Sequence, residues 1–312
     1  MKSTREGFGE KLAELGESEK DLVVLDADVA SSTRTELFAD SFPDRFFNMG
    51  VAEQNMVLAA AGLALSGKPV VACSLAAFLT GRAFDQIRSC VAIPGIPVTL
   101  VGTHAGITVG EDGVTHQMTE DVALMRSLPG MSVMTAADAV SAGKILESAV
   151  ASGRPVYVRL GREPVPEIPD TARESFTVGG GRLLVEGDGI TICATGIMVS
   201  EAMLAAEVLA RQGVSAEVID CYSIKPLPEQ VLLASFRRTG CCVVAEEHNR
   251  IGGLCEAVAG LVSARFPIPM RFVAIDDRYG QSGSPRELQE YYGLTSGEIV
   301  GAAIQAWALR RR

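Results

Sequence analysis

Short apolar runs rich in β-branched residues alternate, along the first half of the chain, with stretches in which apolar residues recur at helical spacing. That alternation is typical of βαβ units arranged around a mostly parallel sheet. The predicted strands are Leu22–Leu25, Val70–Ala72, Val98–Val101, Ser132–Met134 and Val156–Val158, and the predicted helices lie near 4–16, 52–66, 82–92, 120–128 and 137–151.

A break in this pattern divides the chain. Between Glu163 and Gly181 the sequence holds three prolines, several charges and a glycine triplet, which is typical of a linker. We therefore predict an α/β fold of two domains, each a mostly parallel sheet flanked by helices, with a first domain at 1–165, a linker at 166–184 and a second domain at 185–312. The second domain's predicted strands are Ile190–Ala194, Ala216–Ile219, Cys242–Ala245 and Phe272–Ile275, and its predicted helices lie near 198–212, 228–236, 252–265, 285–292 and 296–309.

Charge and composition narrow the choice of partners. The 312 residues carry a formal net charge of −10, which disfavours binding to nucleic acid or to an anionic membrane, because both need clustered Lys and Arg. No apolar run reaches the roughly 20 residues that span a bilayer, and the start of the chain does not resemble a signal peptide. Seven cysteines without a C-x-x-C pair indicate a reducing compartment. We expect a cytoplasmic protein without a metal site of its own, since zinc-ligand spacings are missing.

Two of the chain's three histidines flank an acidic, glycine-rich loop. His104 closely follows the predicted strand Val98–Val101, and the loop up to Gln117 carries Asp112 and His116 among several glycines. In open α/β sheets, ligands bind beyond the carboxyl ends of the strands. Glycines let the backbone fold tightly there, so that short polar side chains converge on a small polar substrate. The loop therefore predicts an active-site wall.

Two further residues have both a structural and a functional interpretation. Glu53 begins a predicted helix whose following residues are almost wholly apolar, so its carboxylate is placed to exchange a proton with a ring nitrogen. An acidic residue in a first turn more often only compensates the helix dipole. Phe78 lies just past the predicted strand Val70–Ala72, where an aromatic ring could stack on a planar ligand, although a lone phenylalanine more often belongs to the core.

Together these segments resemble the transketolases, which are thiamine-diphosphate enzymes that move two-carbon ketol units between sugars. The loop His104-Ala-Gly-Ile-Thr-Val-Gly-Glu-Asp-Gly-Val-Thr-His-Gln117 is similar nearly end to end to the family's H-D-S-I-G-L-G-E-D-G-P-T-H-Q, with Val114 in place of the usual proline. The segment Val51-Ala-Glu-Gln-Asn-Met56 resembles the family's glutamate-bearing helix. The resemblance covers essentially the whole chain and implies a pyrimidine-binding domain followed by the smaller transketolase C-terminal domain.

The resemblance implies a role for each polar residue of these segments. Glu53 would hydrogen-bond the aminopyrimidine ring of thiamine diphosphate and so promote removal of the thiazolium proton. His104, Asp112 and His116 would bind sugar hydroxyls, and the two histidines would also assist proton transfer.

Shorter matches imply further contacts. The segment around Phe78 resembles the family's pyrimidine-stacking segment only with a one-residue insertion, so Phe84 stays an alternative. The segment Asp26-Ala-Asp-Val-Ala-Ser-Ser32 resembles the family's A-D-L-A-P-S, which implies a cofactor contact for Asp28 and a substrate-phosphate contact for Ser32.

An arginine is also implied for the sugar phosphate. Arg162 matches the family's phosphate-holding arginine, and a planar guanidinium grips phosphate bidentately. Arg159 is a competing candidate, and a surface arginine before a linker is an equally simple explanation. His248 lies in an E-E-H motif similar to one in related synthases, and we interpret it as an interface or structural residue.

The sequence lacks a site for the metal–diphosphate end of the cofactor. The family binds that end through Mg²⁺ with a G-D-G motif and a downstream asparagine. Gly187-Asp188-Gly189 is present, but the only asparagines are Asn48, Asn55 and Asn249, none suitably placed, and the triplet precedes a predicted strand as an ordinary turn would. The resemblance thus implies one subunit of a split transketolase that acts on sugar phosphates. Its partner, an N-terminal transketolase subunit, would carry the diphosphate and Mg²⁺ site in an α2β2 assembly.

Two alternatives stay open. The β subunit of a 2-oxo acid dehydrogenase shares the architecture and the A-E-Q glutamate, but that family lacks the G-E-D-G-x-T-H-Q loop. A noncatalytic regulatory or scaffolding homologue would not be expected to retain Glu53, His104, Asp112 and His116 together.

Overall fold

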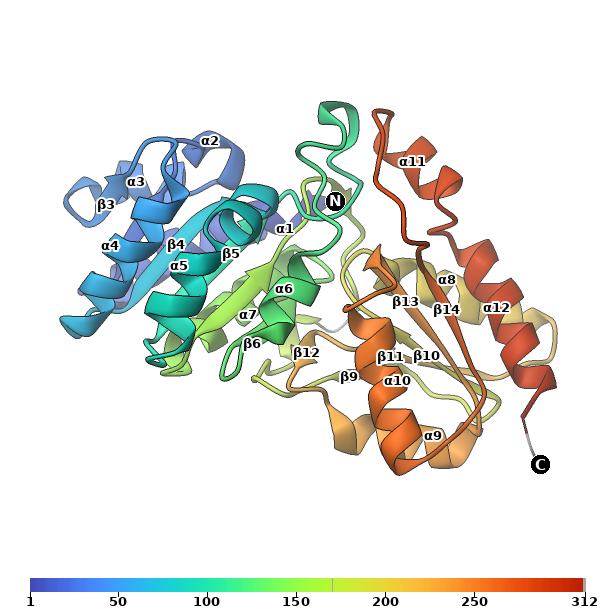
Figure 1. The fold of residues 1–312 in the computed structure, drawn as a ribbon. Coiled ribbons are helices and arrows are strands. Elements are labelled where there is room, and N and C mark those ends of the chain that lie inside the picture. The colour runs from blue at the N-terminus through green and yellow to red at the C-terminus, as the bar shows by residue number, and fades with distance from the viewer. Residues whose placement is uncertain (170, 311–312) are drawn as a thin grey trace.

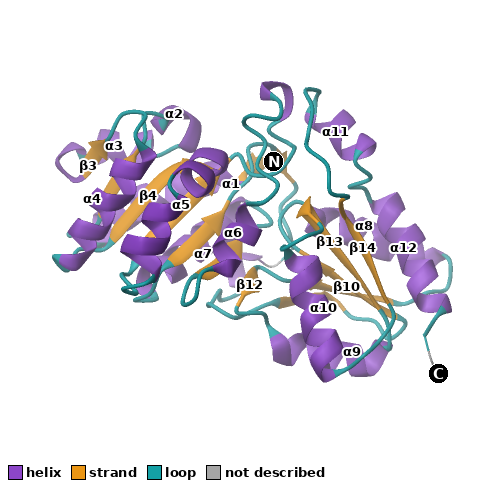
Figure 2. Ribbon diagram, viewed as in Figure 1, coloured by secondary structure: helices purple, strands orange, loops and turns teal. Residues whose placement is uncertain are grey.

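Two α/β units lie side by side in the computed structural model, which describes residues 1–169 and 171–310 (Figure 1). The first, blue to green in Figure 1, is built on a seven-stranded sheet, and the second, yellow to red, on a five-stranded sheet. Helices cover the faces of both sheets (Figure 2). The predicted fold class, two mostly parallel sheets flanked by helices, is therefore confirmed. No helix in the described part of the chain is both long and apolar enough to cross a membrane.

The seven-stranded sheet has the order β12-β6-β7-β5-β4-β2-β3, and only β12 runs antiparallel to its neighbour. The central strands β4 (Val70–Leu75) and β5 (Val98–Thr103) are buried along their whole length, as expected for parallel strands with helices on both faces. The other strands are β2 (Val23–Asp26), β3 (Phe46–Asn48), β6 (Ser132–Thr135), β7 (Val156–Arg159) and β12 (Ser223–Lys225).

Helices α1 (Thr4–Ser18) and α7 (Ala139–Ala151) pack against each other on one face of this sheet, and each begins with a capping box, at Ser3 and at Asp138. The other face carries α4, α6 and a long irregular helix that contains two π-helical stretches. These elements are α4 (Glu53–Leu65), the π-helices Ala77–Arg82 and Ile87–Ala92 on either side of α5 (Phe84–Gln86), and α6 (Asp121–Ser127), while α2 (Ala30–Thr33) and α3 (Glu36–Ser41) lie between β2 and β3.

The five-stranded sheet has the order β14-β13-β10-β11-β9, with β9 antiparallel at one edge. Helices α8 and α12 pack on one face and α9 and α10 on the other. The elements are β9 (Arg182–Val185), β10 (Ile190–Ala194), β11 (Ala216–Asp220), β13 (Cys242–Asn249), β14 (Met270–Ile275), α8 (Met198–Arg211), α9 (Glu229–Thr239), α10 (Leu254–Arg265), α11 (Pro285–Tyr291) and α12 (Ser296–Ala308).

The two units are joined by more than the linker. After β11 the chain crosses to the first sheet, where β12 pairs with β6 and places Ser223 opposite Met134. One hydrophobic cluster includes Leu100 of the first sheet and Val244 of the second. A shared strand and a shared core therefore hold the second domain in a defined position against the first.

The structure differs from the sequence prediction mainly in short elements. The pattern did not predict the strands β1 (Lys2–Ser3), β8 (Pro164–Val165), β3 and β12, or the helices α2 and α3, because they are too short to display a period. It also did not predict β9, although β9 is as long as β2. Residues 182–184, at the end of the predicted linker 166–184, form the first part of β9, where buried Arg182 donates to Thr171 Oγ1 at 3.1 Å. The domain limits stay a prediction.

Candidate active site

The candidate site lies where four neighbouring parallel strands of the first sheet end. Asp28, Glu53, Phe78 and His104 follow β2, β3, β4 and β5, which are adjacent in the sheet. Carboxyl ends of parallel strands share one edge, and this edge is the usual ligand-binding position in open α/β sheets. In Figure 1 the green loop after β5 rises from this edge between the two domains.

Glu53 is the first residue of α4, and its side chain is only 2% exposed. Its Oε2 accepts a hydrogen bond from Arg82 Nη1 at 2.8 Å, and Gln54 of the same helical turn donates to the carbonyl of Arg82 at 3.2 Å. A buried carboxylate needs such a partner because removing an unpaired charge from water is costly. The sequence pattern did not single out Arg82, since its position relative to Glu53 depends on the packing of two helices.

Phe78 lies in the first π-helical stretch, between Arg82, the partner of Glu53, and the histidine loop. The guanidinium of Arg82 sits 4.6 Å from the centre of the Phe78 ring, and His116 meets that ring edge-on at 5.2 Å. Phe84 instead packs against the hydrophobic core. Of the two candidate phenylalanines, Phe78 is the one beside the other site residues.

His104 occupies a strained and buried position. Its φ of 56° lies in the left-handed region, which is uncommon for a residue other than glycine. Thr103 Oγ1 lies 2.9 Å from Nδ1, and Arg5 Nη1 lies 3.5 Å from Nε2. Burial, reinforced by the charges of Arg5 and Arg162, lowers the pKa of His104 to about 4. The ring is therefore neutral at neutral pH, with Nε2 facing a cation.

Arginines converge beside His104. Arg5 Nη1 also donates to the carbonyl of Ser32 at 2.7 Å, and Arg162 forms an ion pair with Asp112 at 3.2 Å. Burial lowers the pKa of Arg5, and the positive charges of Arg34 and Arg162 lower it further. This local excess of positive charge in an acidic chain can hold an anion bidentately. Arg5, on α1, was missed at the sequence level, because nothing near it in the chain marks it as functional.

Asp28 lies apart from this group. Its φ is 66°, and its carboxylate accepts a hydrogen bond from Asn48 Nδ2 at 2.8 Å. The turn that presents it is shaped by buried Asp26, whose carboxylate accepts hydrogen bonds from Val29 N, Thr33 Oγ1 and Thr35 Oγ1. Asp28 thus borders the site from the β2 and β3 side.

Two other residues that the sequence analysis considered, Arg159 and His248, have structural roles. Arg159 is buried, and its Nε forms an ion pair with Asp121 at 2.9 Å, so it has no free face for a substrate. His248 is buried in the second domain, and its Nε2 accepts a hydrogen bond from Ala123 N of α6 at 3.4 Å. His248 therefore lies at the interface between the domains.

The Gly187-Asp188-Gly189 triplet has a structural explanation as well. It precedes β10, at the amino end of the second sheet, whereas the candidate site lies at carboxyl ends. A Cβ on Gly187 would come within 2.4 Å of the Ala216 carbonyl carbon, so the chain needs glycine there for close packing.

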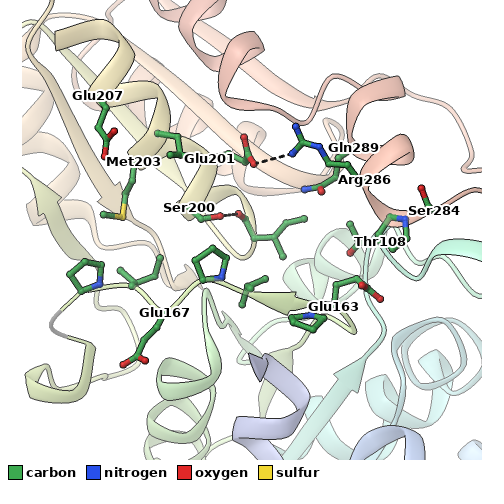
Figure 3. A pocket seen from close by; sticks show the side chains of 18 residues that line it. Thr108, Glu163, Glu167, Ser200, Glu201, Met203, Glu207, Ser284, Arg286 and Gln289 are labelled. Atoms are coloured by element: carbon green, nitrogen blue, oxygen red, sulfur yellow. Dashed lines mark hydrogen bonds and ion pairs between the residues drawn. The ribbon is translucent and has the colours of Figure 1, made fainter. Parts of the chain in front are cut away.

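A separate cavity of about 520 Å³ lies behind the histidine loop, between the linker, α8 and α11 (Figure 3). Thr108 and Ser284 lie at one end of it, and Glu201 and Arg286, which also line it, form an ion pair at 3.8 Å. The cavity is not lined by Glu53, Phe78 or the two loop histidines, so it adjoins the candidate site without forming part of it.

Comparison with known proteins identifies the family. Residues 1–167 match the transketolase pyrimidine-binding domain and residues 179–299 the transketolase C-terminal domain. A solved structure described as "Split gene transketolase, inactive beta4 tetramer" is 45% identical, superposes with a TM-score of 0.93, and each chain covers 100% of the other.

Two curated relatives show how much of a transketolase this chain spans. A Clostridium sp. (strain MSTE9) protein, the "6-deoxy-6-sulfo-D-fructose transketolase subunit SqwH", is 41% identical over 96% of this chain and 92% of its own length. Transketolase from Homo sapiens is 36% identical over 96% of this chain but only 48% of its own length. The chain therefore belongs to the transketolase family, and it carries that family's pyrimidine-binding domain followed by its C-terminal domain.

Proposed function

We propose that this chain is one subunit of a thiamine-diphosphate-dependent transketolase that transfers a two-carbon ketol unit between sugar phosphates. The observation that carries the proposal is the grouping, at one sheet edge, of a buried carboxylate, an aromatic ring and two histidines: Glu53, Phe78, His104 and His116. A proton-exchanging carboxylate beside a ring platform suits the activation of a heterocyclic cofactor, and the histidines suit a polyhydroxylated substrate.

The residues present fit the pyrimidine end of thiamine diphosphate. Glu53 would hold a proton at a pyrimidine nitrogen, because its carboxylate is buried and only Arg82 competes for it among the hydrogen bonds of the described residues. Phe78 would offer its ring to the pyrimidine, and Asp28 would border the cofactor. The bound cofactor supplies the electron sink for cleaving the bond next to a sugar carbonyl. These side chains orient it and exclude water from the ring.

The polar loop would hold the sugar. His104, neutral and facing Arg5, and His116, beside Phe78, would bind hydroxyls and move protons during transfer. Asp112 would bind sugar hydroxyls with the two histidines. Arg162 and Ser32 would bind the far, anionic end of the substrate, with Arg5 adding positive charge there. The Clostridium relative is named for a sulfonated sugar, and sulfonate offers the same triad of oxygens as phosphate, so both end groups belong in the substrate test.

A partner subunit would carry the metal–diphosphate site. The chain spans about half of the human transketolase, and after Asn55 the residues of α4 are apolar on its outer side as well as its inner side. Leu65 and Leu58 of α4 are 73% and 45% exposed, and a Cβ on Gly62 would meet nothing within 4 Å. Val51, two residues before the helix, is 72% exposed. A helix that is apolar all round is normally buried, so this face suits a docked subunit. We propose an N-terminal transketolase subunit, Mg²⁺ held by that subunit, an α2β2 assembly and, given the free cysteines, a cytoplasmic enzyme.

The test is reconstitution. The chain is mixed with an N-terminal transketolase subunit that carries the G-D-G motif, and ketol transfer is measured with thiamine diphosphate, Mg²⁺ and a phosphorylated or sulfonated ketose. Transfer with the phosphorylated ketose is expected. Transfer confined to the sulfonated ketose would correct the substrate, and an assembled complex that binds the cofactor but transfers from neither would refute the proposal in favour of a noncatalytic homologue.

A further inference from the structure

Three consecutive buried residues at the end of β13 each reach a different neighbouring element. Glu246 accepts hydrogen bonds from Leu254 N at 2.7 Å and Cys255 N at 2.8 Å, at the start of α10 in its own domain. His248 accepts from α6 of the first domain. Glu247 points to the first domain too, where its Oε1 accepts from Thr108 N at 2.8 Å. The E-E-H motif is thus a set of backbone acceptors, and one of them serves the loop that begins at His104.

Glu247 fits against that loop closely. Gly106 has a φ of 82°, and a Cβ there would lie 2.2 Å from the Glu247 carboxyl carbon, so only glycine admits the carboxylate. Burial raises the pKa of Glu247, while Arg159 and the backbone N–H groups of Ile107 and Thr108 favour its charged form. Its own carbonyl accepts from Arg159 Nη2 at 2.8 Å. Side chain and backbone of Glu247 are therefore both bound to the first domain.

The loop depends on such anchors because it has little regular structure. His104 is held at a positive φ, which costs free energy unless the surroundings impose it. Gln117 satisfies the carbonyls of Ile107 at 3.1 Å and Gly110 at 3.3 Å, and it also donates to Gln281 of the second domain at 2.9 Å. Figure 1 shows this green loop beside the red segment that precedes α11. The second domain thus contacts the loop at two points: Glu247 accepts from the Thr108 N–H, and the Gln281 carbonyl accepts from the Gln117 side chain.

We propose that Glu247 is a positioning residue of the transferase: from the second domain it fixes the backbone of residues 106–108 and thereby the orientation of His104 in the first domain. The inference rests on the proposed function, since it assigns His104 to the sugar. Glu247 itself touches neither the substrate nor the cofactor. The second domain, on this account, acts as a clamp on the catalytic loop.

The chain offers a matched control. Glu246 and Glu247 are adjacent and buried, and both accept backbone N–H groups, but only Glu247 contacts the histidine loop. E247Q keeps the size of the side chain while replacing one acceptor oxygen with a donor that faces N–H groups. In the reconstituted complex, E247Q should lower kcat/KM about tenfold to a hundredfold, because small misplacements of reacting groups have effects of that size. E246Q should lower the melting temperature but leave kcat/KM near that of the wild type.

A second readout needs no catalysis. The chain has only three histidines, so ring resonances of the isotope-labelled full chain can be assigned by single substitutions. Loosening the loop should expose His104, whose ring pKa should then rise from about 4 toward its ordinary value of 6.5 in E247Q and stay unchanged in E246Q.

The outcomes separate the two proposals. A wild-type complex without ketol transfer would refute the proposed function. The histidine titration would still test whether Glu247 positions His104. Equal kcat/KM for E247Q and E246Q together with an unshifted His104 pKa would overturn the inference. Should E247Q not fold, E247D keeps the charge but is one methylene shorter. The clamp predicts reduced kcat/KM for E247D at normal solubility, and wild-type kcat/KM would overturn it.

Discussion

The two sheets have the same architecture and use the same edge for different purposes. In the first domain, the residues that follow the strands form the candidate active site, and two of them, Asp28 and His104, sit at positive φ. In the second domain, the corresponding end of β13 carries Glu246, Glu247 and His248, all buried and all bound to backbone N–H groups. A polar residue at a strand end therefore indicates chemistry only where its hydrogen-bonding capacity is not already used by the fold.

The comparison also shows how the two uses depend on each other. Strained residues at a site persist only when the surrounding structure imposes their conformation. Here part of that structure comes from the other domain, through Glu247 and through the contact of Gln117 with Gln281. The second domain therefore helps to fix the geometry of the candidate site in the first domain.

The largest effect is expected on removing the partner subunit. The first-domain edge offers a carboxyl hydrogen bond and an aromatic ring to the cofactor, worth about 2–4 kcal/mol together, whereas micromolar affinity requires about 8 kcal/mol. The chain alone should transfer no ketol units and bind thiamine diphosphate with Mg²⁺ more weakly than micromolar. Calorimetric titration checks this, and micromolar binding by the chain alone would show that its own edge is sufficient.

The next largest effect distinguishes carboxylates of the two domains. E53Q should reduce kcat of the reconstituted complex about 10²- to 10⁴-fold, because an amide cannot hold and return the ring proton. E246Q, the second-domain counterpart, should change the melting temperature and not kcat. Turnover and thermal melts of both variants test the contrast. An E53Q complex that keeps more than roughly half of wild-type turnover would contradict the assigned role.

The three histidines extend the contrast between the domains. His104→Ala and His116→Ala should each weaken the use of sugar phosphates by about 1–3 kcal/mol, because sugar hydroxyls would lose their hydrogen-bond partners, with cofactor affinity retained. His248→Ala should lower stability and spare kcat/KM, because His248 accepts a backbone N–H at the domain interface. Steady-state kinetics measure kcat/KM of the three variants, and cofactor titrations measure their affinity for thiamine diphosphate. An equal fall in cofactor affinity for His104→Ala or His116→Ala would mean that the loop faces the cofactor instead.

The smallest expected effect is on stability and not on activity, and it distinguishes two buried aspartates. The carboxylate of Asp26, in the first domain, accepts three hydrogen bonds. The carboxylate of Asp220 accepts none from the described residues, and Arg182 Nη1 lies 3.8 Å from its Oδ2. Burial raises the pKa of Asp220 to about 7 from an ordinary 3.8. The folded state then keeps a proton that the unfolded state has released, so this contribution to stability is present below pH 4 and is lost as pH rises through 7.

Asp220→Asn should abolish that loss. The stability of the variant relative to wild type should therefore increase between pH 4 and pH 8, by roughly 4 kcal/mol at most. Denaturant unfolding across this range measures the difference. A difference that stays constant with pH, or that changes in the opposite direction, would show that Arg182 keeps Asp220 ionised throughout.

The sequence alone determined the fold class, the positions of the long strands and helices, and the grouping of His104, Asp112 and His116 in one loop. These features depend on local period and on neighbours in the chain, which a sequence displays directly. Only the tertiary structure showed three contacts between distant residues. Arg82 contacts Glu53, Arg5 contacts His104 and Glu247 contacts Thr108 of the loop, across separations of 29, 99 and 139 residues. It also placed the short strand β12 in the first sheet. Such contacts depend on which faces of distant elements pack together, and no local pattern around an arginine or a glutamate carries that information.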